Sequence, residues 1–548
     1  MAPLFVGSNS DDSRIRSDRV SVAASTSNPA SAVTGDAYYN SSDNALKIYS
    51  GSDWASVGAG GGSITGIASG SLSDGQAAIV HSDGKVGAIS TTGITLGIGS
   101  SDTWYTGGNQ FTASAYDPIA QRVAVFYRDT SASSYGKVVI GTVTGLGITF
   151  GSPVQFVNSE TANIAAVYDE SGGRILFAFR KDGPGEIDQI TISGDVPTPF
   201  SGQTLHGGST QFISAAYDST AKRSVFCYRD NSDSNYLKAN VVQAVGGGIV
   251  GLTIGSEQTV AYESVSDDAQ SGTGEGKGTQ VVYHAAKNRM VATFYNGSTG
   301  RAGTFSVNAT NNTISASSFN NFNNGSTRAI STVYDENAKK VVIVYRDNSN
   351  SNRGTALIAD IDDSSNNMIY GTPVVFETNT IYKTAVQYDP STKKVLVFWT
   401  ISSPTNATYV AAGTVSGDSI TFEEKELIVA DYESDYMTSV YDSNNEKVVF
   451  SYRGGGHQSN DGMSYVIRTP FVDTNLTADN FAGFSNAAYT NGQTATIQVS
   501  GSVDDAQSGL TTARTHYVQN DGTLSTTAGT PSVVGGTAIS ATKIIVQG

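Results

Sequence analysis

The stretch AYDPIAQRVAVFY, residues 115–127, contains the pattern that decides the fold. It joins a Tyr-Asp pair to a short turn and then to a run of β-branched and aromatic residues. The pattern occurs seven times, and in every copy an aromatic residue follows the tyrosine by 11 positions. Such constant spacing indicates a repeat architecture. The tyrosines are Tyr116, Tyr168, Tyr217, Tyr283, Tyr334, Tyr388 and Tyr441, and the closing aromatics are Tyr127, Phe179, Tyr228, Phe294, Tyr345, Trp399 and Tyr452.

Each repeat has the pattern of four β-strands. Within 123–127, Val and Tyr alternate with Ala and Phe, which is typical of a strand. The residues before Tyr116 form a strand too, and the Asp-Pro pair after it favours a tight turn. Two more strands are predicted at 136–143 and 148–156. Four strands in a unit of about 50 residues are typical of a propeller blade. The sequence therefore predicts an all-β fold, a seven-bladed β-propeller.

A propeller ring must close, or its first and last sheets keep open edges. Residues 94–108, ITLGIGSSDTWYTGG, resemble the fourth strand of other repeats, so we expect this N-terminal strand to complete the last blade. The long interval between Tyr217 and Tyr283 contains an insertion, 266–278, that is predicted to be a surface loop. The predicted organisation is an attachment or oligomerisation β module with a Gly linker at 1–62, a small β-hairpin segment at 63–91, the propeller at 92–474 and a small β module at 475–548.

Composition limits the classes of function. The chain has 33 basic and 49 acidic residues, a net charge of −16, and nucleic acid as a partner would need a basic surface instead. The same charge favours a neutral over an anionic glycan, because like charges repel. No apolar run approaches the roughly 20 residues of a membrane span, so no membrane insertion is expected. The single cysteine, Cys227, is expected to be a buried apolar residue of a blade strand.

Both flanks of the repeats resemble modules of bacteriophage proteins. Residues 35–58, GDAYYNSSDNALKIYSGSDWASVG, are similar to a short module near the start of tail-fibre and virion proteins, and the matching positions are Gly35, Tyr39, Asn44, Leu46, Tyr49, Gly51, Trp54 and Gly58. Residues 479–548 resemble a C-terminal module of structural proteins from marine and cyanobacterial phages, through Gly509-Leu510-Thr511, Tyr517-Val518, Asn520-Asp521-Gly522 and the ending 538–548. The resemblance covers about a fifth of the chain and implies a virion structural protein.

Two polar features recur from blade to blade. The Asp of the Tyr-Asp pair is present in six repeats, and His284 replaces it in the fourth. Because it recurs, we interpret this Asp as a turn-forming residue rather than as a ring of functional carboxylates. Arg-Asp pairs end the second strand at Arg128, Arg229 and Arg346, and here we favour ion pairs or carbonyl contacts between blades.

The loops after these Arg residues are the candidate binding site. They read RDTSASSY, RDNSDSNY and RDNSNSNR, and Tyr or Arg follows each Asp by six residues. Tyr among small polar residues is the composition of adaptable recognition loops. The candidate ligand-binding residues are Asp129, Tyr135, Asp230, Tyr236, Asp347 and Arg353.

No catalytic or metal motif is evident in the sequence. The five histidines lack the spacing of metal ligands, and the loop at Asp230 lacks the acidic series of a Ca²⁺ loop. The repeated Asp boxes of sialidase propellers are absent. A glycosidase needs two facing carboxylates, which a sequence cannot pair. We therefore expect no catalytic residues, no metal and no cofactor.

The expected function is that of a non-enzymatic, tail-fibre-like virion protein, assembled in the host cytoplasm. Its N-terminal segment would bind other virion proteins, and its propeller would bind a host cell-surface glycan or protein. The flanking modules are too small to hold a core alone, so a homotrimer is expected. Two alternatives remain open: a capsid decoration or tail component without a receptor role, and a propeller glycan hydrolase or lyase.

Overall fold

The computed structural model describes residues 24–34, 36–42, 45–49, 51–57, 62–245, 251–267, 278–401, 406–430, 434–455 and 460–547. Most of the predicted insertion at 266–278 and of the Gly linker lies outside these residues. The chain divides into two compact units, Thr95–Phe471 and a second unit made of Met1–Ile94 with Val472–Gly548.

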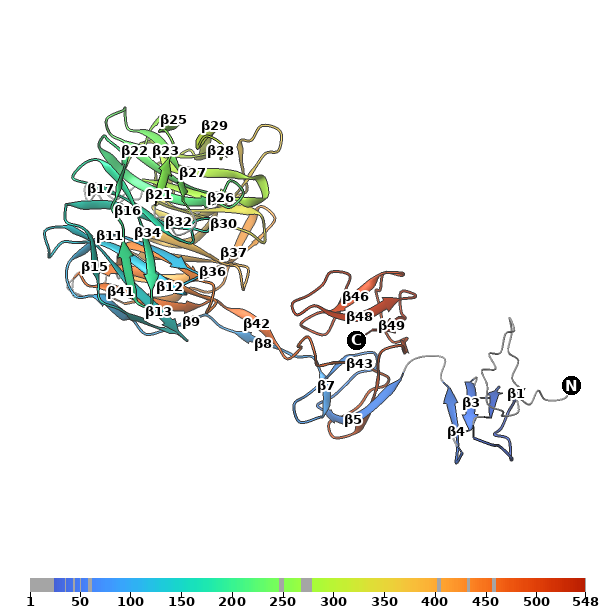
Figure 1. Ribbon diagram of the computed structural model, residues 1–548. Coiled ribbons are helices and arrows are strands. Elements are labelled where there is room, and N and C mark those ends of the chain that lie inside the picture. Colours follow the sequence, from blue (N-terminus) through green and yellow to red (C-terminus); the bar gives the residue numbers. More distant parts are fainter. Residues whose placement is uncertain are drawn as a thin grey trace. The chain divides into compact units, whose positions relative to one another are not determined.

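The unit Thr95–Phe471 is all-β and propeller-like, with repeated antiparallel sheets (Figure 1). In each repeat a first strand ends in the Tyr-Asp pair, a second and a third follow, and short outer strands pair with the third. The first three sheets contain β11 (Asn109–Asp117), β12 (Arg122–Asp129), β13 (Tyr135–Thr144), β14 (Gly147–Phe150) and β15 (Val154–Val157); β16 (Thr161–Asp169), β17 (Arg174–Lys181), β18 (Gly185–Ser193), β19 (Val196–Pro199) and β20 (Gln203–His206); and β21 (Thr210–Asp218), β22 (Arg223–Asp230), β23 (Tyr236–Ala244), β24 (Leu252–Ile254) and β25 (Gln258–Ser264).

The later repeats follow the same order with two variations. A short 3-10 helix, η1 (Ala285–Lys287), forms the fourth turn, and the long strand β34 pairs with β32 through its first half and with β35 through its second. The strands are β26 (Thr279–His284), β27 (Arg289–Tyr295), β28 (Gly300–Asn308) and β29 (Thr313–Asn323); β30 (Thr327–Asp335), β31 (Lys340–Asp347), β32 (Arg353–Ile361) and β33 (Met368–Tyr370), with η2 (Asn348–Asn350); β34 (Val374–Asp389), β35 (Lys394–Ile401), β36 (Ala407–Ser416), β37 (Ser419–Phe422) and β38 (Glu426–Val429); and β39 (Ser434–Asp442), β40 (Lys447–Gly454) and β41 (Gly462–Arg468).

The last repeat receives its outer strands from the N-terminal side of the repeats. β9 (Gly97–Ile98) and β10 (Asp102–Tyr105) both pair with β41, as the sequence pattern of 94–108 predicted. Trp104 of β10 is buried, and its ring centroid lies 4.9 Å from that of Tyr127 in the first repeat. A Cβ at Gly462 would lie 2.4 Å from the Trp104 ring, so the ring packs where only glycine leaves room.

The second strands are buried on both faces, because each lies between two other sheets. In β12, Ala124 and Phe126 belong to a cluster with Phe177 of the second repeat, whereas Val125 and Tyr127 pack with Val449 of the last repeat. Alternate residues of a second strand therefore face the two neighbouring sheets, rather than a core on one side and solvent on the other.

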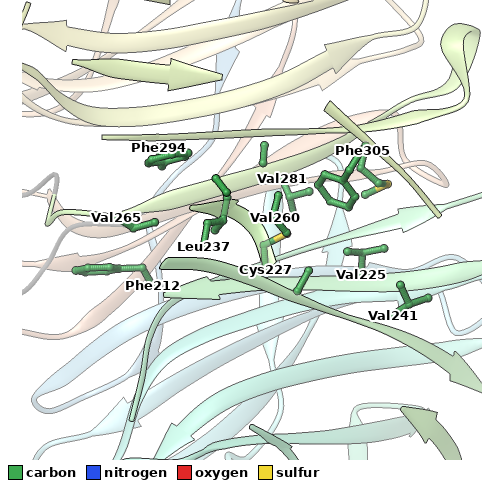
Figure 2. Packing of buried hydrophobic residues seen from close by; sticks show 14 residues of the cluster. Phe212, Val225, Cys227, Leu237, Val241, Val260, Val265, Val281, Phe294 and Phe305 are labelled. Carbon is green, nitrogen blue, oxygen red and sulfur yellow. The ribbon is translucent and has the colours of Figure 1, made fainter. Parts of the chain in front are cut away.

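Figure 2 shows one of these cores, between the third and fourth repeats. Cys227 lies there among Val225, Leu237 and Phe305, fully buried, which confirms the expected apolar role. Burial raises the pKa of its thiol.

The described residues outside the repeats form four further β structures. Strands from both sides of the repeats combine in the closed barrel and share a core with the C-terminal sheet. The sequence division placed 63–91 and 475–548 in separate modules, because short strands give no signal of which distant strand they pair with. The strands are β1 (Ala24–Ser25), β2 (Ala37–Asn40), β3 (Ala45–Tyr49) and β4 (Trp54–Val57) in one sheet; β43 (Phe481–Ser485), β44 (Thr494–Gln498), β5 (Ser63–Ser69), β7 (Val86–Ala88) and β6 (Ala77–Val80) in the barrel; β8 (Thr91–Ile94) with β42 (Phe471–Thr474); and β45 (Val503–Asp504), β49 (Ile544–Val546), β48 (Val533–Ala538), β46 (Thr515–Val518) and β47 (Leu524–Ser525) in the C-terminal sheet.

Candidate functional site

The Tyr-Asp pairs lie at one end of the propeller-like unit, which we call the turn face. Asp117 Oδ1 accepts hydrogen bonds from the N–H groups of Ile119 and Ala120, both at 2.9 Å. The other five aspartates accept equivalent bonds within their own turns. Because these carboxylates are buried and used in turns, the predicted turn-forming role is confirmed.

The tyrosines of the turn face connect neighbouring repeats. Tyr283 Oη donates to Thr220 Oγ1 of the preceding repeat at 2.6 Å, and Tyr388 Oη accepts from the N–H of Asn337 at 3.2 Å. The same kind of contact joins the first repeat to the last, since Tyr116 Oη accepts from the N–H of Asn444 at 3.3 Å. Burial raises the pKa of Tyr388 to about 12, so the hydroxyl stays protonated at neutral pH.

His284 is the exception at the turn face. Its side chain caps no turn N–H group, and η1 forms in place of the Asp turn. The buried ring lies with Nε2 at 3.4 Å from Asp360 Oδ1, and its pKa is lowered because burial disfavours the imidazolium. The fourth repeat therefore lacks the side-chain hydrogen bond to its own turn, and His284 instead contacts Asp360 in the sheet of the fifth repeat.

The opposite end, which carries the loops 129–135, 230–236 and 347–353, is called the loop face. The predicted aspartates cap these loops: Ser131 N–H donates to Asp129 at 2.9 Å, Ser232 N–H to Asp230 at 2.8 Å and Ser349 N–H to Asp347 at 3.1 Å. Burial raises the pKa of Asp129, but the bonds from Lys137 and Ser131 outweigh it and lower the pKa to about 2.

The other three predicted residues begin the third strands. Tyr135 pairs with Asp129 across the sheet, Tyr236 with Asp230, and Arg353 with Asp347. All three side chains are half-buried rather than exposed in loops. The six predicted residues therefore form three cross-strand pairs in sheets that are not neighbours in the ring order.

The repeated Arg residues of the loop face contact neighbouring repeats and their own. Arg128 Nη1 and Arg180 Nη2 share Glu160 Oε1 at 3.5 and 3.4 Å, an ion pair between the first and second repeats as predicted. Arg229 Nη1 donates to the Val265 carbonyl at 3.1 Å and Nη2 donates to Gln211. Burial lowers the pKa of this guanidinium, and the nearby Asp267 carboxylate opposes that shift.

Each first strand except β26 contains an irregularity near its loop-face end. Aromatic side chains stand at four of them, in β11, β21, β34 and β39. Phe111, Phe212 and Tyr436 adopt left-handed φ values of 53°, 52° and 46°, which cost energy for residues with a Cβ. Guanidinium groups stack over these rings: Arg128 over Phe111 at 5.7 Å, Arg229 over Phe212 at 4.6 Å, Arg453 over Tyr436 at 4.8 Å and Arg346 over Tyr382 at 5.8 Å.

A cavity of about 770 Å³ is lined by all seven first strands. The seven turn-face tyrosines line it, as do the loop-face rings Phe111, Phe212, Tyr382 and Tyr436. Hydroxyl and amide side chains line the wall, and Ser214 is 7% exposed with no hydrogen-bond partner for its Oγ. Its size lies within the range of small-molecule sites. The repeats allowed a prediction of the ring, but not of the side chains that face its axis.

Charged groups of the second and third repeats meet in a cluster that the sequence did not pair. His206 Nδ1 lies 2.5 Å from Glu257 Oε2, and His206 Nε2 lies 3.1 Å from Asp230 Oδ1. The three could in principle hold a metal ion. The imidazole nitrogens each face a different carboxylate, however, and Lys238 Nζ lies 3.6 Å from Glu257 Oε1. This arrangement fits a hydrogen-bonded ion network better than a set of ligands converging on one point.

Beside this network stands an aromatic side chain that the sequence analysis missed. Tyr262 is 78% exposed, and its ring centroid lies 5.6 Å from that of Tyr236, nearly perpendicular at 76°. β25 places it there by pairing with β23, where Tyr236 opposes Ser264. An exposed aromatic ring supported by a half-buried one gives the loop face an apolar contact surface for a ligand.

Comparisons with known proteins add little about the site. No protein-family model matches the chain. No curated protein matches it either. A crystal structure of a protein of unknown function from Dyadobacter fermentans covers 69% of this chain and 99% of its own, with 11% identity and a TM-score of 0.39. A structure described as NanB plus Optactamide covers 66% of this chain and 68% of its own, with 12% identity and a TM-score of 0.38.

Among the described residues, no helix is long and apolar enough to cross a membrane.

Proposed function

We propose that the protein is a non-enzymatic structural component of a bacteriophage virion, a tail-fibre-like appendage that binds a host-surface glycan or protein. Residues 1–62 would attach the chain to other virion proteins, and the assembled form would be a homotrimer. The similarity of 35–58 and 479–548 to phage modules supports the virion part of this proposal.

We infer further that the sheets of Thr95–Phe471 are the blades of a seven-bladed propeller. The first strands β11, β16, β21, β26, β30, β34 and β39 contact one another in this order, and β39 contacts β11. β9 and β10, by pairing with β41, would close the ring without leaving an edge.

The binding role is supported mainly by the difference in side chains between the turn face and the loop face. The turn face repeats the same residues, and its polar atoms are used in turns and in contacts between repeats. The loop face differs from repeat to repeat and presents the exposed Tyr262 packed against the half-buried Tyr236. Recognition evolves where loops vary on a constant scaffold.

The test is a cell-binding assay with the purified full-length protein, fluorescently labelled, on a panel of marine bacterial and cyanobacterial strains. Replacing Tyr236 and Tyr262 together by Ala should reduce binding to a recognised strain at least tenfold, because aromatic contacts dominate such interfaces. The matched control is Ile119→Ala, which removes a 75% exposed side chain at the turn face. Equal binding by the double variant and the control would remove the loop face from the proposal.

Glycan hydrolysis remains the second candidate, because two carboxylates, Glu170 and Glu336, line the cavity. Incubation of the protein with host polysaccharide should produce no new reducing ends if the binding role is right. A capsid or tail component without a receptor role would be recognised by its position in the particle under electron microscopy together with normal adsorption of particles lacking the loop-face tyrosines.

A further inference from the structure

The charges along the cavity differ between its two ends. Glu170 and Glu336 are the acidic residues of its lining, and both follow Tyr-Asp turns at the turn face. Lys383 is the basic residue of the lining, and it lies near the loop-face end of β34. The basic residue of the lining therefore stands toward the loop face, and its acidic residues stand at the turn face.

The guanidinium groups reinforce the positive end. Arg128, Arg229, Arg346 and Arg453 stack on the aromatic rings that line the mouth, within 5.8 Å of the ring centroids. One carboxylate there pairs with two cations in each of two cases. Arg128 and Arg180 both contact Glu160, and Arg453 and Lys383 both contact Asp435. The whole chain carries −16, and here these cations stand beside Glu160 and Asp435 at the loop face.

The side chains of the wall suit a sugar. Ser214 Oγ and Thr112 Oγ1 are buried without hydrogen-bond partners, and both residues line the cavity. A ligand hydroxyl could satisfy them, since a buried polar group without a partner is costly. The aromatic rings Phe111, Phe212 and Tyr436 offer flat apolar faces beside them.

We propose that the loop-face mouth of this cavity binds a carboxylated sugar unit of the host glycan, with the carboxylate held by Lys383 and the surrounding guanidinium groups. This inference rests on the glycan-binding function proposed above and makes it specific. It reverses the expectation from net charge, which favoured a neutral glycan, because binding depends on the local field rather than on the sum over the chain.

The strand β22 provides a matched pair of variants. Arg229 and Arg223 stand near its two ends, the first at the loop face over Phe212 and the second at the turn face, where Nε donates to Asn312 at 2.7 Å. Both donate hydrogen bonds to backbone carbonyl groups, and Asp267 also lies near Arg229. Arg229→Gln and Arg223→Gln therefore remove the same charge from opposite ends of one strand.

The experiment is calorimetric titration of the full-length protein with trigalacturonic acid and with its neutral counterpart galactotriose. We expect trigalacturonate to bind at least tenfold more tightly at low salt, and the preference to shrink strongly when added salt shortens the Debye length to about 3 Å near 1 M. Arg229→Gln should weaken trigalacturonate binding about tenfold, Lys383→Gln should weaken it similarly, and Arg223→Gln should leave it unchanged.

Equal affinity for the two trisaccharides, no binding of trigalacturonate, or equal effects of Arg229→Gln and Arg223→Gln would overturn the inference. Thermal melting of each variant separates loss of binding from loss of folding, and Lys383→Gln gives an independent measure if Arg229→Gln is unstable. Host-cell binding that persists in Arg229→Gln with no preference for the acid contradicts this inference alone. Trigalacturonate binding without binding to any cell contradicts the proposed function instead.

Discussion

The two ends of the same seven first strands differ in what their side chains do. At the turn face, Tyr and Asp recur, and their polar atoms bond to the turns and to the preceding repeat. At the loop face, the corresponding positions hold Phe111, Asn163, Phe212, Ala329 and Tyr436. Uniform positions in a repeat protein hold the repeats together, whereas varied positions are free to recognise a ligand. Four substitutions test this comparison, beginning with the one of largest expected effect.

Trp104→Ala tests whether the two faces depend on a closed ring. The buried ring packs against Tyr127, so we expect a loss of about 3–5 kcal/mol in the free energy of unfolding, typical of a buried Trp. Differential scanning calorimetry should show a lower melting temperature for the propeller-like unit. Trp54→Ala, in the N-terminal sheet of the other unit, is the control and should leave that transition in place. An unchanged transition in Trp104→Ala would mean that closure contributes little.

Asp188→Asn provides a reference for the carboxylates of the turn face, because Asp188 is buried in β18, outside the Tyr-Asp turns. Burial raises the pKa of Asp188 from 3.8 to about 7, and Glu186 adds to the rise. Between pH 4 and 7 the unfolded chain releases this proton while the folded chain keeps it, so the contribution of Asp188 to stability falls as the pH rises. Above pH 7 the carboxyl is ionised in both states, and its contribution no longer changes with pH. Asn removes this cost, on the order of 4 kcal/mol at pH 8 and close to zero below pH 4.

Denaturant unfolding of Asp188→Asn and of the parent chain at pH 4, 6 and 8 measures this gain. The comparison between pH values cancels any constant effect of the amide. A gain that is the same at all three pH values would show that the carboxyl is ionised at no extra cost in the folded state.

Asp442→Ala gives a smaller effect and tests the turn face directly. The buried carboxylate accepts bonds from Asn444 and Asn445 N–H groups at 2.9 and 3.1 Å, so we expect a loss of about 2 kcal/mol. Ligand binding should be unchanged. The loop-face counterpart Asp347→Ala removes a similar but half-buried cap, and should cost about 1 kcal/mol. If Asp442→Ala impaired cell binding at a temperature where the variant is folded, the turn face would also take part in binding, and the two faces would not differ in role.

The sequence by itself determined the features that depend on neighbours along the chain. The constant interval from Tyr116 to Tyr127 and its copies marks two strands and a turn, and an Asp at a turn bonds to N–H groups two and three residues ahead. The likeness of 94–108 to other outer strands also located the pairing partner of β41, because the repeats provide a template for each missing strand.

Only the tertiary structure decided which distant groups meet. His206, Asp230 and Glu257 come from the ends of different elements, and their spacing carries no signal, yet sheet pairing places them within one network. The barrel combines β5, β6 and β7 with β43 and β44 from beyond the repeats. The cavity with its charged ends exists only once the first strands surround an axis. Local hydrogen bonds follow sequence separation, whereas burial and electrostatic fields depend on closure of the whole ring.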